Sequence, residues 1–149
     1  MTTNLKPLRI LVIVILALLA IQYEFGMAVN IANPPSIPPF SFSFSAFRSA
    51  LDQAGVVALL HAGLGGWLVI FTVINLILTL RTRVKSVQVF GVLSFISIAS
   101  AAGGGLFFVL SGFQNDHASH AMATNFLLSF ALFFIELYLI KPNSKSKVN

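Results

Sequence analysis

The sequence contains no cysteine. A chain without thiols has no disulfide framework, no thiolate metal site and no cysteine nucleophile. Charge is scarce too: nine Lys and Arg and four Asp and Glu residues make up 9% of the chain, whereas soluble domains carry about 25%. Hydrophobic residues make up 57%, and the mean hydropathy is +0.92. Together these values exclude a soluble globular domain and a disordered tail.

Long uncharged runs occupy most of the chain. Residues 10–23, 53–80, 86–115 and 117–135 contain no Asp, Glu, Lys or Arg. A helix needs roughly 20 apolar residues to cross a hydrocarbon core of about 30 Å. We therefore predict an all-α integral membrane protein, a single domain over residues 1–149 that forms an up-down-up-down four-helix bundle. The predicted spans are residues 10–31, 54–80, 86–112 and 118–140.

The basic residues indicate how such a bundle is oriented. Eight of the nine flank the same side of the predicted spans: Lys6, Arg9, Arg81, Arg83, Lys85, Lys141, Lys145 and Lys147. The positive-inside rule then places both termini and the 81–85 turn in the cytoplasm, as in a multi-pass protein of the cell membrane. The net charge of +5 is thus explained by topology in the lipid bilayer, without a nucleic-acid partner.

The start of the chain has an alternative interpretation. A basic beginning, an apolar run at residues 10–21 and the small residues near Gly26 also match a cleavable secretory signal. We favour a first membrane span.

The loop at 32–53 is the one sizeable segment outside the predicted spans. Phe40, Phe44, Phe47 and Leu51 fall at helical spacing, with Ser and charged residues elsewhere around the turn. This pattern predicts a short amphipathic helix lying on the outer membrane interface.

Small and polar residues should mark the buried faces, because lipid does not drive helices together through the hydrophobic effect. In the second span such a face comprises Ala54, Ala58, His61, Gly65, Leu68, Thr72, Asn75 and Thr79. In the third span a similar face comprises Gly91, Ser94, Ile98, Ala101, Gly105 and Gly112. In the fourth span the predicted inward face comprises His117, His120, Thr124, Leu127, Ala131 and Tyr138. A second polar face of that span, Asn125, Ser129 and Glu136, either seeks a protein partner or lets Glu136 pair with Arg81, Arg83 or Lys85.

Several polar and small residues share one depth. His61 and His120 lie about 28 and 30 Å from the cytoplasmic ends of their helices, counted at the helical rise. Met27, Asn30 and the glycines Gly104 and Gly105 fall at the same level. This coincidence predicts a site near the outer face.

Two inward histidines at one height predict axial ligation of a haem, since neutral imidazole is a common haem ligand. Glycine on a neighbouring helix would let a flat macrocycle approach the backbone. With His61 in Leu60-His-Ala-Gly and His120 in Asp116-His-Ala-Ser-His, the chain resembles four-helix b-type cytochromes and one half of haem A synthase. The resemblance implies binding of haem b and electron transfer with a quinone or another membrane partner. The chain is also similar to an uncharacterised group of small bacterial four-helix membrane proteins, which implies no activity.

Other interpretations stay open at this point, and no motif identifies an enzyme class. Asp116, His117, His120 and His61 are candidate ligands for copper or zinc. His61 could instead be a structural imidazole bonded to Glu24 or Asn30. Glu24, a carboxyl within a span, is a candidate proton relay. Finally, the chain could be a non-enzymatic accessory or assembly subunit of a larger membrane complex.

Overall fold

The computed structural model describes residues 5–32 and 43–140, the side chains of Asn30 and Ala32 excepted. This part contains five α-helices and no strand: α1 (Lys6–Ala32), α2 (Phe44–Ala54), α3 (Val56–Leu80), α4 (Lys85–Leu110) and α5 (Asp116–Leu139). The four longer helices are long and apolar enough to cross a membrane. They agree with the predicted spans to within a few residues and indicate a multi-pass membrane protein.

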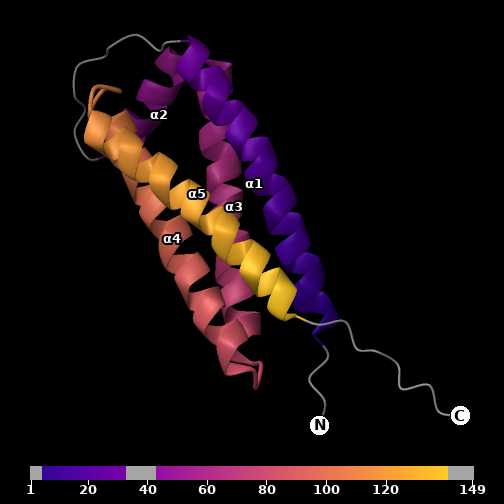
Figure 1. Ribbon diagram of the computed structural model, residues 1–149. Helices are drawn as coiled ribbons and strands as arrows, with labels where there is room; N and C mark the ends of the chain where they lie inside the picture. The colour runs from indigo at the N-terminus through magenta and orange to yellow at the C-terminus, as the bar shows by residue number, and fades with distance from the viewer. Residues whose placement is uncertain (1–4, 33–42, 141–149) are drawn as a thin grey trace, which may run out of the picture.

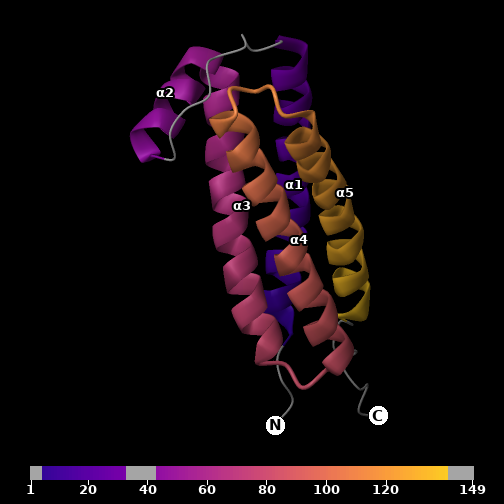
Figure 2. The ribbon, with the colours of Figure 1, turned by 90° about the vertical axis from the view of Figure 1, so that its left-hand side faces the viewer.

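The four long helices form an antiparallel bundle (Figures 1 and 2). Along the bundle α1 packs on α3, α3 on α4, and α4 on α5. Helices α1 and α5 approach each other where α1 begins and α5 ends, an end that we call the base. There Arg9 Nη1 donates a hydrogen bond to the backbone oxygen of Ile140 at 2.9 Å. Towards the opposite end, which carries α2, α1 and α5 diverge (Figure 1).

The buried faces of α3 and α4 are as predicted. Thr72, Asn75 and Thr79 of α3 are fully buried, and so is Ser94 of α4. Gly91 of α4 lies directly against Thr79, so that a Cβ at Gly91 would stand 2.9 Å from Thr79 Oγ1. Small residues therefore set the separation of these helices, as expected where van der Waals packing drives association.

The short amphipathic helix exists as α2, and its position at a membrane interface stays a prediction. Ser43 caps its start, accepting a hydrogen bond from the Ala46 N–H at 3.1 Å. Its apolar side packs on α3 and α4 through Ala50 and Leu51. Gly55, at φ 94° and ψ 174°, joins α2 directly to α3. Phe44 is 81% exposed and takes no part in this packing, and Phe40 lies outside the described residues.

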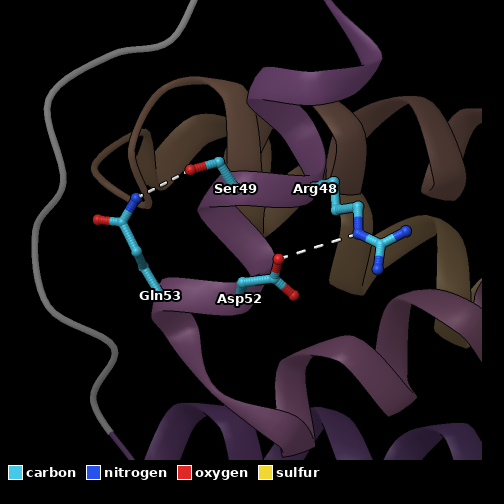
Figure 3. A network of polar contacts seen from close by, with 4 residues as sticks. All are labelled: Arg48, Ser49, Asp52 and Gln53. Atoms are coloured by element: carbon cyan, nitrogen blue, oxygen red, sulfur yellow. Dashed lines mark hydrogen bonds and ion pairs between the residues drawn. The ribbon is translucent and has the colours of Figure 1, made fainter.

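The other side of α2 is polar and faces away from the bundle. Arg48 Nε lies 3.9 Å from Asp52 Oδ2, and Gln53 Nε2 donates to Ser49 Oγ at 3.2 Å (Figure 3). The division into an apolar and a polar side is the one that the spacing of this segment predicts.

The predicted inward face of the fourth span is wrong. All of its members are exposed: His117, His120, Thr124, Leu127, Ala131 and Tyr138. Gly104 explains the difference, because a Cβ there would stand 3.1 Å from the Met122 backbone nitrogen and 3.2 Å from the Ala118 oxygen. Ser97 Oγ also donates to the Asn125 oxygen at 2.7 Å. The small residues of α4 thus select the opposite side of α5 for close packing.

The second polar face of α5 is therefore an interior face. Ser129 and Glu136 are fully buried, so neither offers a surface to a partner. Glu136 accepts hydrogen bonds from Asn75 and Thr79 of α3. The predicted pairing of Glu136 with the basic 81–85 turn is wrong, because Glu136 points across the bundle rather than towards its end.

Candidate functional site

A cavity of about 370 Å³ lies between the helices at the α2 end of the bundle. All five helices contribute to its wall, which is mainly aliphatic and aromatic. Among the described residues, its polar side chains are those of Gln22, Tyr23, His61 and Ser119. No charged side chain of the described part lines it.

Aromatic rings surround the cavity at both of its ends. Phe47 of α2 and Phe113, in the turn after α4, lie at the end that α2 covers. Phe113 has φ 62°, and its ring meets Phe108 edge to face with the centroids 5.5 Å apart. Nearer the middle of the bundle, Tyr23 of α1 stacks on Phe126 of α5 at 6.5 Å. This contact bridges the two helices that diverge around the cavity.

His61 of α3 is held against α1. Gly26 makes this approach possible, because a Cβ there would stand 3.2 Å from His61 Cε1. One turn earlier in α1, Gln22 is 8% exposed, and its Nε2 donates to the His61 backbone oxygen at 3.1 Å. The same Nε2 lies 3.4 Å from His61 Nε2.

These contacts fix the proton of the neutral imidazole. An amide nitrogen only donates, so the bond to the His61 carbonyl sets the orientation of the Gln22 amide, and His61 Nε2 acts as acceptor. The ring proton then lies on Nδ1. His61 Nδ1 and Gln22 Oε1 are both buried and have no hydrogen-bond partner within the described ranges. Two residues that line the cavity thus hold one buried unused donor and one buried unused acceptor, an arrangement that buried polar groups rarely show.

The structure brings together part of the site predicted from sequence. His61, Met27 and Gly105 all line the cavity. Residues that share one predicted depth therefore lie around one cavity in the structure. Gly104 instead packs against the α5 backbone. Asp116, His117, His120 and Glu24 are exposed and do not line the cavity. Asn30 belongs to α1, but its side chain is outside the described part.

The chain matches no family model, no curated protein and no solved structure. Its function therefore has to be argued from its own geometry.

The residues at the cavity do not fit a haem held by two histidines in this arrangement. His61 Nε2 already faces the Gln22 amide, and His120 lies on the exposed side of α5. Among the described residues, no three His, Asp or Glu side chains come together as a metal site. The prediction for His120 rested on its depth and on the expected inward face of its span, and that face is exposed in the structure.

Sequence reasoning gave Gln22 no part in the site, and it also missed Ser119. Gln22 was recognisable as a polar residue one turn from Gly26 in an otherwise apolar run. Ser119 carried no such signal, because its place in the cavity depends on the rotation of α5.

Proposed function

We propose that this protein binds a membrane-dissolved amphiphile, a molecule with an apolar body and a small uncharged head, in the cavity at the α2 end. The observation that carries the proposal is the combination of an apolar cavity with an unused donor and acceptor at Gln22 and His61. Binding sites for small molecules are typically apolar pockets of roughly 300–1,000 Å³ with a few polar groups that orient the ligand.

The chemistry of the wall limits the ligand. A charged head would be desolvated without a countercharge, since no charged side chain of the described part lines the cavity. An unbranched hydrocarbon would leave His61 Nδ1 and Gln22 Oε1 without partners. A hydroxyl head group accepts from His61 Nδ1–H and donates to Gln22 Oε1 once these buried side chains turn towards the ligand. Isoprenoid quinols carry such hydroxyls, whereas the carbonyls of a quinone only accept, so the proposal keeps the reduced form of the predicted quinone as a candidate ligand.

The binding test uses two glycines of α3 that differ in one respect. A Cβ at Gly66 or at Gly63 would meet nothing within 4 Å, but only Gly66 lines the cavity. We expect Gly66→Leu to weaken binding of decyl-quinol, a short-chain quinol probe, at least tenfold, which corresponds to about 1.4 kcal/mol. Gly63→Leu should bind like the wild type. Equilibrium titration of the purified protein, with native mass spectrometry for stoichiometry, measures both; equal affinity for the two variants would contradict the proposal.

We place the α2 end at the outer face of the membrane, following the positive-inside rule. The absence of cysteine makes a clean labelling test possible. Gln114, in the turn after α4, and Arg83, in the turn before it, are both exposed and lie at opposite ends of the bundle. A membrane-impermeant maleimide should label Gln114→Cys in intact cells and Arg83→Cys only after permeabilisation. The reverse pattern would invert the orientation.

Haem binding, a copper or zinc site and an accessory role stay predictions. An absorption spectrum and metal analysis of the purified protein test the first two, and co-purification of a larger complex tests the third.

A further inference from the structure

A buried carboxyl group lies far from the cavity, in the half of the bundle nearer the base. Glu136 of α5 is 0% exposed. Asn75 Nδ2 donates to Glu136 Oε1 and Oε2 at 3.1 and 3.2 Å, and Thr79 Oγ1 donates to Oε1 at 3.0 Å. The proposed amphiphile site uses none of these groups, so their role needs a separate explanation.

No basic side chain compensates this carboxyl in the part of the chain that the structure describes. The groups that face it from α3 are neutral, and α4 contributes Gly91 and Ser94 to the same region. On α1, Arg9 donates to the Ile140 oxygen instead. The ion pair among the described residues is the one between Arg48 and Asp52 on α2. An ionised carboxylate without a countercharge is strongly disfavoured inside a membrane bundle.

Asn75 provides the second observation. Its Nδ2 serves both carboxylate oxygens, while its Oδ1 is buried and lacks a hydrogen-bond donor. A proton on Glu136 would supply that donor. After a rotation of the amide, the carboxyl O–H would donate to Asn75 Oδ1 while Nδ2 still donates to the other oxygen. This closed acid–amide pair satisfies every polar atom of the two side chains.

We propose that Glu136 and Asn75 form a proton-binding site within the membrane. A carboxylate oxygen of Glu136 takes one proton from a hydronium ion, whose O–H bond breaks to leave water; the carboxylate charge is neutralised, and the new O–H donates to Asn75 Oδ1. No electron is transferred and no other bond breaks. Thr82 lies three residues beyond Thr79, nearer the base, and its Oγ1 is also buried without a partner in the described region. The base is the nearer end of the bundle for a proton, because Glu136 and Thr79 lie within about one turn of the ends of α5 and α3.

A sodium ion could use the same oxygen atoms, but the packing favours the proton. A metal ion needs several ligands around a space of its own. Thr79 is pressed against Gly91, where even a single methyl group has no room. A proton needs no such space, so the two ligands are distinguishable by experiment.

Infrared spectroscopy of the full chain in phosphatidylcholine vesicles at neutral pH tests the proposal directly. We expect a protonated-carboxyl stretching band that shifts in heavy water and is lost in Glu136→Gln. Asp52→Asn, which removes an exposed carboxyl of α2, should keep the band. Asn75→Leu should keep it at a changed frequency, because the carboxyl loses its amide partner. Absence of the band in the wild type, or its persistence in Glu136→Gln, would overturn the assignment.

Two further measurements cover the remaining outcomes. Glu136→Gln resembles the neutral acid in shape and charge, so we expect it to be folded. If Glu136→Gln unfolds while Glu136→Asp stays folded, the ionised form is needed and the proposal fails. Thermal unfolding in sodium chloride against choline chloride should show no sodium effect. A sodium-dependent stabilisation that Glu136→Gln abolishes would assign the site to the cation instead.

Discussion

Replacing Gly91 with alanine should destabilise the bundle by about 1–3 kcal/mol, the usual cost of overpacking a tight interior. The added methyl group would stand 2.9 Å from both Thr79 Cβ and Thr79 Oγ1. Thr79 is fully buried and tied to Glu136, so it has no free direction in which to move. Helices α3 and α4 would therefore have to separate. Thermal unfolding in mild detergent, followed by circular dichroism, measures the loss.

Gly103→Ala is the matched control for this prediction. Gly103 lies on the same helix, and a Cβ there would meet nothing within 4 Å. Both substitutions bring the same gain in helix propensity, about 1 kcal/mol in water. Gly103→Ala should therefore match or exceed the wild type in stability. Equal behaviour of the two variants would show that contact with Thr79 does not set the helix separation.

The second large effect is expected at Phe133. This side chain is 0% exposed and packs in the main apolar core with residues such as Val12 and Val87. Its truncation in Phe133→Ala leaves a cavity, which costs roughly 3–5 kcal/mol in soluble cores. In a micelle the unfolded chain stays in an apolar medium, so the loss of transfer free energy from water is smaller. The loss of van der Waals contacts around the new cavity remains. We expect a loss of about 2–3 kcal/mol.

Phe134 allows a direct comparison in the same unfolding assay. It follows Phe133 in sequence but is 55% exposed, on a face of α5 that would meet lipid. Phe134→Ala should change stability by less than about 0.5 kcal/mol, as surface substitutions usually do. A similar loss for both phenylalanines would mean that the Phe134 face is also covered, as in an oligomer or a larger complex.

The helices and most of their inward faces were predictable because their signals are local. Gaps between charges mark the spans, and small residues such as Gly91 and Ser94 mark where α4 meets α3. The rotation of α5 was not predictable in this way. The polar side chain of His120 suggested that its face of α5 points inward. Instead, the backbone of α5 at Ala118 and Met122 packs against Gly104, and this contact decides which side of α5 is buried.

The candidate site was predictable only as far as depth determines it. His61, Met27 and Gly105 share one level, and the structure gathers them at one cavity. The hydrogen bonds of His61 could not be predicted, because they depend on the position of the Gln22 amide group in the folded bundle. Glu136 was recognised as a polar residue of the fourth span. Its partners Asn75 and Thr79 become apparent only once α3 and α5 are placed side by side.

Gly55 connects α2 to α3 through a backbone conformation that is almost confined to glycine, at φ 94° and ψ 174°. A single residue thus sets the angle between the two helices, and any swing of α2 must pivot at this point. Leu51 and Phe47 travel with α2, and both line the cavity. Gly55 itself contributes no atom to the lining. The backbone of a glycine outside the cavity therefore helps to position two of its wall residues, and a residue that cannot adopt this conformation would shift that part of the wall.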